Sequence, residues 1–296
     1  MAAPTDSAPG PFFDLPPEHC DPARAAALLV PVPYDRTSSW KRGSAAGPEA
    51  IREASQQVEL YDIETGTEPY RHGIAATAPI DFDGPPEALA RRVEEVIGPA
   101  LDAARLPVVI GGEHSVTIGA VAAAADRVPG LSVLQIDAHA DARETHEGST
   151  HNHACVMARA RERCPIVQVG IRSLDASERP RLDSERIFFA HDIHRAGGCL
   201  WIDRVVQLLD DAVYITIDLD AFDPSVLPAT GTPEPGGLDW MQVTGLLERV
   251  IARRRVVAFD VVELCPADGH HASAFTAAKL IYRVLAMIFA ARPTPS

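Results

Sequence analysis

The sequence predicts an α/β protein of three layers, α-β-α, with a central and mainly parallel sheet. Short apolar runs without clear polar alternation are typical of strands that are buried on both faces. Amphipathic stretches separate these runs, as expected of helices that cross over between parallel strands. The expected strands are 27–33, 106–112, 131–136, 165–171, 186–190, 213–217 and 256–262, and the expected helices are 87–105, 116–127, 154–163, 201–209, 240–254 and 272–291.

The first residues differ in composition from the rest of the chain. Residues 1–24 are rich in proline, alanine and small polar residues and have no sustained periodicity, so we expect a loosely ordered N-terminal arm. Residues 25–296 contain no internal repeat and no linker-like tract before the last five residues. We therefore expect them to form a single domain.

Charge and cysteine content exclude several classes of partner. With 41 acidic and 27 basic residues the net charge is −14, which disfavours nucleic acid and anionic membrane surfaces and favours a small cationic ligand. No apolar stretch approaches the roughly 18 to 20 residues of a membrane span, and the N-terminus lacks the cationic start of a signal peptide. The five cysteines form no close pair. An odd number of unpaired thiols predicts a reducing compartment, the cytoplasm.

Acids and histidines directly follow four of the expected strands. GGEHS (111–115), DAHAD (137–141), DLD (218–220) and VVE (261–263) each stand where an apolar run ends. Parallel sheets bind ligands at the carboxyl ends of their strands, so these side chains are expected to meet at one edge.

The spacing of these residues predicts a metal site. Side chains at i and i+2 of an extended segment share a face. Six potential ligands follow: His114, Asp137, His139, Asp141, Asp218 and Asp220. A single DxD after a strand is commonly a turn or a helix cap. The presence of GGEHS, DAHAD and DLD at three strand ends favours metal binding instead. A pair of divalent cations relieves the repulsion among the four carboxylates.

Two cations about 3.5 to 4 Å apart bind one bridging water, which loses a proton near neutral pH and becomes a metal-bound hydroxide. Oxygen-rich ligands with two imidazoles favour Mn²⁺ and leave iron, cobalt, nickel or zinc possible.

The motifs resemble those of the ureohydrolase family, which contains arginases and agmatinases. These enzymes hydrolyse guanidino groups with two manganese ions. The resemblance covers most of the chain and is carried, besides GGEHS and DAHAD, by residues 32–55, HNHACVM (151–157), VGIRS (169–173), the segment 216–238 and FDVVELCP (259–266). It implies an arginase-like fold, one catalytic domain over 25–296, and a homo-oligomer, either a trimer or a hexamer.

The resemblance also implies roles for the site residues. One metal is expected on His114, Asp137, Asp141 and Asp218, and the other on Asp137, His139, Asp218 and Asp220. His153 matches the family's catalytic histidine, which passes a proton to the leaving amine, and Glu263 matches the carboxylate that binds the guanidinium. Asp141 is also expected to accept a hydrogen bond from the hydroxide. Two residues depart from the common pattern: Glu113 replaces an aspartate and Cys265 replaces an asparagine.

The substrate expected from these motifs is agmatine, hydrolysed to putrescine and urea in polyamine biosynthesis. HNHACVM and VVELCP look like agmatinases, whereas the loop 142–150 and Ser173 lack the polar and acidic residues with which arginases hold an amino acid. Another guanidino substrate, such as arginine or a guanidino acid, is a competing hypothesis. Arg143 offers a guanidino acid a cationic anchor, although it is equally explained as a solvent-exposed side chain. A catalytically silent homologue is a third hypothesis.

Overall fold

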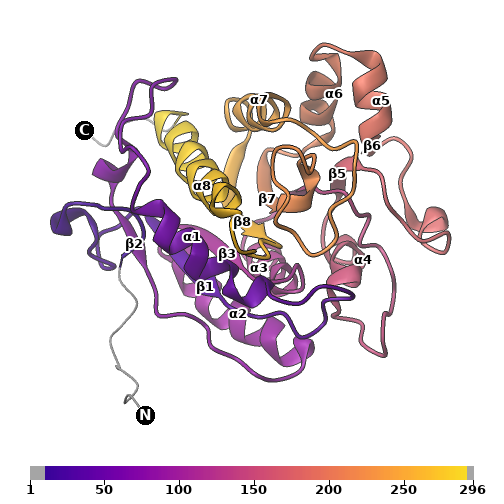
Figure 1. Cartoon of the computed structure of the whole chain (residues 1–296), viewed down its shortest axis with the longest axis horizontal. Helices are drawn as coiled ribbons and strands as arrows, with labels where there is room; N and C mark the ends of the chain where they lie inside the picture. Colours follow the sequence, from indigo (N-terminus) through magenta and orange to yellow (C-terminus); the bar gives the residue numbers. More distant parts are fainter. Residues whose placement is uncertain (1–10, 292–296) are drawn as a thin grey trace.

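The computed structural model describes residues 11–291, which form one eight-stranded sheet with helices on both faces (Figure 1). All neighbouring strands pair in parallel, in the order β2-β1-β3-β8-β7-β4-β5-β6. The strands are β1 (Ala27–Val32), β2 (Ile74–Ala76), β3 (Leu106–Gly111), β4 (Leu131–Ile136), β5 (Ile166–Ile171), β6 (Ile187–Phe189), β7 (Ala212–Asp218) and β8 (Arg255–Val262). The predicted three-layer α/β fold is confirmed.

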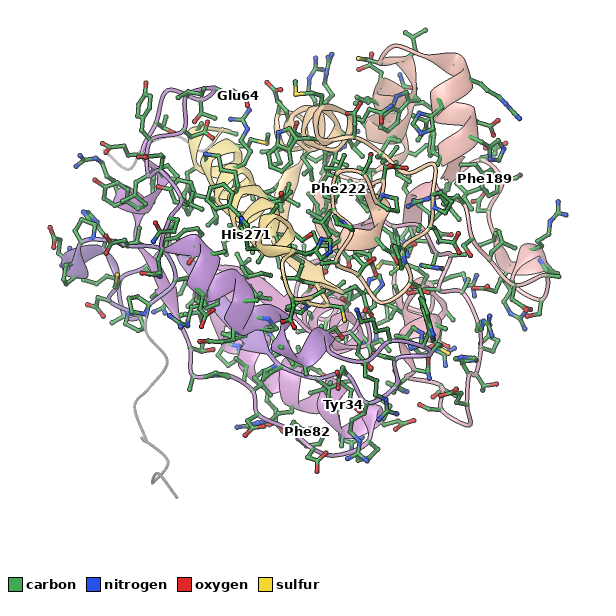
Figure 2. All side chains as sticks on the ribbon, in the orientation of Figure 1. Tyr34, Glu64, Phe82, Phe189, Phe222 and His271 are labelled. Carbon is green, nitrogen blue, oxygen red and sulfur yellow. The ribbon has the colours of Figure 1, made fainter. Side chains whose placement is uncertain are left out.

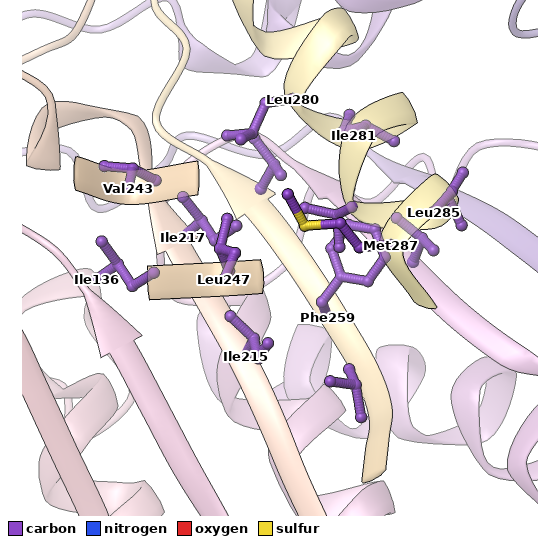
Figure 3. Close-up of a cluster of buried hydrophobic side chains, with 14 of the residues drawn as sticks. Ile136, Ile215, Ile217, Val243, Leu247, Phe259, Leu280, Ile281, Leu285 and Met287 are labelled. Atoms are coloured by element: carbon purple, nitrogen blue, oxygen red, sulfur yellow. The ribbon is translucent and has the colours of Figure 1, made fainter. Parts of the chain in front are cut away.

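Two sets of helices cover the two faces of the sheet. On one face the apolar core contains side chains of α1 (Gly47–Ser55), α5 (Ala190–Ala196), α6 (Leu200–Leu208), α7 (Trp240–Ile251) and α8 (His271–Ala291). On the other face it contains side chains of α2 (Pro86–Asp102), α3 (Val116–Ala125) and α4 (Val156–Arg161). Figure 3 shows the first core, where Ile215 and Ile217 of β7 pack with Phe259 of β8 beneath α7 and α8.

All seven expected strands and all six expected helices are present. Strand β2 was not predicted, because three residues at the edge of the sheet carry no periodic signal. Helix α1 was missed because Ile51 is its one large buried apolar side chain. Helix α5 begins at Ala190, the last residue of an expected strand, and ends at Ala196, and Gly197 follows it with a φ of 60°, which glycine adopts readily.

The expectation that no segment reaches the length of a membrane span was wrong in one place. Helix α8 is long and apolar enough to pass that test by length and composition. Two thirds of the tested window, 67%, is buried inside the protein, where α8 packs against the sheet, α1 and α7. Its apolar character is therefore explained by its position in the core.

Part of the expected N-terminal arm is packed against the domain. Residues 1–10 lie outside the described residues, and the division at residue 24 stays a prediction. Phe12, Phe13 and Leu15 are buried in the core beside α8, and the N–H of Phe13 donates to the hydroxyl of Ser55 at 2.7 Å. Residues 11–15 are thus held in place by apolar burial, unlike the loose arm that their composition suggested.

Helix α8 also carries a buried ion pair. Arg283 lies 2.5 Å from Asp62, and both side chains are almost completely buried, while its second partner, Glu64, is half exposed. We expect Asp62→Ala to destabilise the protein by about 3 kcal/mol, because removing one member of a buried pair leaves the other without its compensating charge. Glu64→Ala is the matched control and costs under about 1 kcal/mol, because its partner keeps Asp62.

Urea denaturation of the metal-free protein measures both variants. Equal losses of unfolding free energy in Asp62→Ala and Glu64→Ala would contradict the expectation that the buried pair of Arg283 and Asp62 contributes most of the stability.

Candidate active site

The four central strands of the sheet deliver the acids and histidines to one edge. His114 follows β3, Asp137 follows β4, Asp218 ends β7 and Glu263 follows β8. These strands are neighbours in the order β3-β8-β7-β4, and all of them point the same way. Their carboxyl ends therefore bring together residues that are far apart in the sequence, as the motifs predicted.

The first group of potential ligands surrounds Nδ1 of His114. This nitrogen lies 3.0 Å from a carboxylate oxygen of Asp141, 3.2 Å from Asp137 and 3.5 Å from Asp218. His114, Asp137 and Asp218 offer ligand atoms within 4.8 Å of one another, and all three are buried. Asp141 adjoins this group through its contact with His114, so the four residues expected at the first metal are together.

The second group shares Asp137 with the first. It consists of Asp137, His139 and Asp220, again with ligand atoms within 4.8 Å. Nδ1 of His139 lies 2.9 Å from Asp220 and 3.8 Å from Asp137. Asp218 was expected here as a second bridging ligand, but it has a ligand atom within 4.8 Å of the other members only in the first group.

Backbone hydrogen bonds fix the carboxylates of both groups. The N–H of His139 donates to Asp137 at 2.6 Å, that of Ala138 to Asp220 at 3.1 Å, and that of Asp220 to Asp218 at 2.8 Å. Each donor lies on one of the loops that follow β4 and β7. The loops therefore set the direction of the side chains, which leaves the cluster little freedom to spread apart.

Two residues of the site have a backbone conformation that side chains rarely adopt. Asp141 has a φ of 48° and Glu263 a φ of 67°. Such left-handed residues cost free energy, and they persist only where the surrounding structure holds them. The N–H of Glu263 donates to Gly112 at 2.7 Å and its side chain accepts from the N–H of His114 at 2.7 Å. These two bonds hold Glu263 against the first ligand group.

The charge distribution fits a site for cations. Burial, and then the neighbouring charge of Asp220, raise the pKa of Asp137 to about 7. Burial and the charges of Asp220 and Asp137 likewise raise the pKa of Asp218 well above its ordinary value. Nδ1 of His114 is buried and has no hydrogen-bond partner of good geometry among residues 11–291, although three carboxylates face it. Divalent cations bound between these groups would satisfy the nitrogen and offset the negative charge.

His153 stands at the side of this cluster, in a pocket that reaches the surface. The pocket is lined by His139, Asp141, His153, Asp218, Asp220 and Glu263 among others. His153 follows Asn152, whose side chain caps a short 3-10 helix over His153–Cys155. Burial lowers the pKa of His153 and outweighs the opposing charge of Asp141, which favours a neutral ring near neutral pH.

The outer part of the pocket contains residues that the sequence analysis missed. Asp175 and Glu178 line it two and five residues beyond Ser173, and Trp40, Lys41 and Ser39 line it from the loop before α1. Trp40 is 74% exposed, an unusual state for so large an apolar side chain. Only their position in the folded protein identifies these residues as part of the pocket, since none of them belongs to a motif to which the sequence analysis assigned a chemical role.

Arg143 also lines the pocket, but acids surround it. Its guanidinium lies 3.9 Å from both Asp175 and Glu178 and 3.1 Å from a ring nitrogen of His146. Cys265 is buried and its thiol contacts the carbonyl oxygen of Arg42 at 3.6 Å, which agrees with a small core residue.

Comparison with known proteins identifies the family. The model of the arginase family matches residues 25–287. The chain belongs to the arginase family. It is 39% identical to an N(1)-aminopropylagmatine ureohydrolase of Synechocystis sp., over 89% of each chain, and 32% identical to an agmatinase of Pyrococcus horikoshii, over 93% of this chain and 96% of that one.

A solved structure supports the same assignment. The agmatine ureohydrolase of Thermoplasma volcanium superposes with a TM-score of 0.83 at 33% identity, covering 90% of this chain and 91% of that one. The resemblance inferred from the motifs is therefore confirmed, and the chain is an agmatinase-like ureohydrolase of the arginase family.

Metal should stabilise the protein more at pH 8 than at pH 6. The pKa of Asp137 is raised to about 7, and that of His139 to about 10, because Asp220 and Asp137 outweigh its burial. Both values exceed those of the unfolded chain, so protonation stabilises the folded metal-free protein at low pH, and this contribution is lost as pH rises through the folded values. Protons therefore compete with metal at pH 6.

Thermal unfolding with and without Mn²⁺ at both pH values measures this effect. An ion present at 100 times its dissociation constant adds about 2.7 kcal/mol. Asp137→Asn, which weakens both ligand groups, should lose most of the shift at pH 8. A wild-type shift at pH 6 that equals or exceeds the shift at pH 8 would refute the explanation.

Proposed function

We propose that this protein hydrolyses the guanidino group of a cationic alkylguanidine to urea and an amine, using two divalent ions. The observation that carries the proposal is the pair of ligand groups sharing Asp137, with Glu263 and His153 beside them in one pocket. N(1)-aminopropylagmatine is the first candidate substrate because relatives with 39% and 41% identity carry that name. Agmatine, the substrate expected from the motifs, is the second, supported by the agmatinase at 32% identity.

The residues of the chain have distinct roles in this reaction. Glu263 binds the guanidinium, because a carboxylate matches its planar N–H donors. The two ligand groups would hold the divalent ions, which would lower the pKa of water and so supply a nucleophile near neutral pH. Asp141 accepts a hydrogen bond from the attacking water and orients it toward the guanidinium carbon. His153 passes a proton to the amine nitrogen as the C–N bond breaks.

The outer pocket favours an amine over a carboxylate on the substrate's tail. Asp175 and Glu178 line it, and Arg143, the candidate anchor for a guanidino acid, lies 3.9 Å from both of them. A cation that is already close to two acids attracts a further carboxylate weakly, whereas an ammonium group gains the attraction of both acids. This arrangement supports a guanidinoalkylamine rather than arginine or a guanidino acid.

The remaining properties follow from the family and the composition. We propose Mn²⁺ as the metal, because the ligands are mainly carboxylate oxygens with two imidazoles and no thiolate. We further propose a cytoplasmic homo-oligomer, a trimer or a hexamer, on the unpaired cysteines and the family resemblance.

The Mn²⁺-loaded protein should release urea from N(1)-aminopropylagmatine and agmatine, and little from arginine or guanidino acids. The additional ammonium of the longer substrate contributes one partly exposed ion pair, at most about 1 kcal/mol, so its kcat/KM should exceed that of agmatine by about fivefold. Urea and amine products are measured together. Preferred turnover of a guanidino acid would overturn the tail assignment, and two bound metals without urea from any guanidine would establish a silent homologue.

Asp175→Asn should remove most of the preference for the longer substrate while leaving kcat for agmatine within about twofold, because the loss is one exposed ion pair. Asp192→Asn is the matched control, since this acid is exposed on α5 and lies outside the pocket. An unchanged ratio of the two kcat/KM values in Asp175→Asn would show that the acid does not contact the tail.

A further inference from the structure

A buried carboxylate stands behind His153 and is joined to it by one hydroxyl group. Glu113 is completely buried and accepts hydrogen bonds from the hydroxyl of Thr37, the N–H of Thr37 and the hydroxyl of Ser115, each at 2.6 Å. The oxygen of Thr37 lies 3.2 Å from Nδ1 of His153. It also accepts from the backbone N–H of His153 at 3.0 Å. Glu113 thus reaches the histidine through Thr37.

The hydrogen-bonding capacity of the Thr37 hydroxyl determines which ring nitrogen carries the hydrogen. A hydroxyl has one donor and two acceptor positions. Its hydrogen is directed at a carboxylate oxygen of Glu113, which accepts it at 2.6 Å. The backbone N–H of His153 takes one acceptor position. The contact with Nδ1 uses the other, so Nδ1 must donate and Nε2 is left with its lone pair.

Other contacts agree with this direction of hydrogen bonding. The backbone N–H of Thr37 can only donate to Glu113, and the hydroxyls of Thr37 and Ser115 both lie 2.6 Å from the other carboxylate oxygen. On the opposite edge of the ring, the hydroxyl of Ser39 lies 3.1 Å from Nε2 and can donate to its lone pair. Ser39 and His153 both line the pocket, which places the edge of the ring that bears Nε2 beside a pocket residue.

We propose that Glu113, acting through Thr37, is a positioning residue that holds His153 as the Nδ1–H tautomer with Nε2 free for proton transfer. The proposal deepens the proposed function and rests on it for the role of His153. Nε2 accepts the proton released by the attacking water and gives it to the amine nitrogen, which receives the electron pair of the breaking C–N bond. The ring then returns to its neutral form, and the hydroxyl of Thr37, held by Glu113, keeps its contact with Nδ1.

Backbone contacts around Glu113 hold Glu113 and the loop of Thr37 in fixed positions relative to each other. The N–H of Glu113 donates to the carbonyl oxygen of Tyr34, which is labelled in Figure 2, at 2.7 Å. A Cβ on the preceding residue, Gly112, would stand 2.1 Å from that oxygen, so only glycine permits the approach. The loop that carries Thr37 is thereby fixed to the residue beside the first metal ligand. The glutamate of GGEHS, which departs from the more common aspartate, is the group that bonds Thr37.

The tautomer can be observed directly. In ¹⁵N-histidine-labelled protein loaded with diamagnetic Zn²⁺, long-range ¹H–¹⁵N spectra distinguish protonated from unprotonated ring nitrogens, and His153→Gln assigns the signals. We expect wild type and Thr37→Ser to show Nδ1 protonated and Nε2 unprotonated. Thr37→Val should show a mixture of both tautomers, because it removes the hydroxyl and keeps the shape. A wild-type ring protonated at Nε2 would overturn the proposal.

Kinetics test the consequence for proton transfer. Thr37→Val and Glu113→Gln should lower kcat by about 10- to 100-fold with KM changed less than about twofold, and Thr37→Ser should stay near wild type. Thr244→Val is the matched control, because it removes a buried hydroxyl on α7 that does not line the pocket and should leave kcat unchanged. An unchanged kcat in Thr37→Val, or an equal loss in Thr244→Val, would contradict the proposal.

The two sets of measurements separate this proposal from the proposed function. If the wild-type protein released no urea from any guanidine, the proposed function would fail, and the tautomer spectra would still decide whether Glu113 and Thr37 orient His153.

Discussion

Repulsion among buried carboxylates is the constraint around which the rest of this structure is arranged. Asp137, Asp218 and Asp220 are buried almost completely, and Asp141 nearly so, in a region that water does not screen. The parallel sheet brings these groups together because the carboxyl ends of its four central strands meet at one edge. Backbone N–H donors that follow β4 and β7 hold the carboxylates of Asp137, Asp218 and Asp220 in place. An arrangement so unfavourable for the protein alone is explained by the cations it is suited to bind.

The sequence predicted those features that depend on residues close to one another along the chain. Apolar runs located seven of the eight strands, and the acids that follow them located both ligand groups, because a strand end places the next residues at a known edge. It did not reveal Asp175 as part of the pocket or Thr37 as a partner of His153, since both depend on how loops fold over the sheet. Helix α8 shows a further limit of the sequence, because its composition alone does not distinguish a core helix from a membrane span.

The pocket is lined by two kinds of residue, those that directly follow strands and those on longer loops. The ligand groups and Glu263 directly follow strands of the sheet, whereas Trp40, Arg143 and Asp175 stand on longer connections. Loops tolerate substitution better than the elements they connect. A family can therefore retain one reaction at the metals and vary the tail of the guanidine, which accounts for relatives named for N(1)-aminopropylagmatine and for agmatine on the same fold.

The place of β8 in the sheet has a consequence for how the chain is made. It is the last strand in the sequence, yet it pairs with β3 on one side and β7 on the other. Without β8, the strand pairs of the folded sheet fall into two separate half-sheets, β2-β1-β3 and β7-β4-β5-β6, each with an unpaired inner edge. Such edges invite pairing with other chains. Protection from aggregation during synthesis therefore matters most just before residues 255–262 emerge, and a chain truncated ahead of them keeps both edges open.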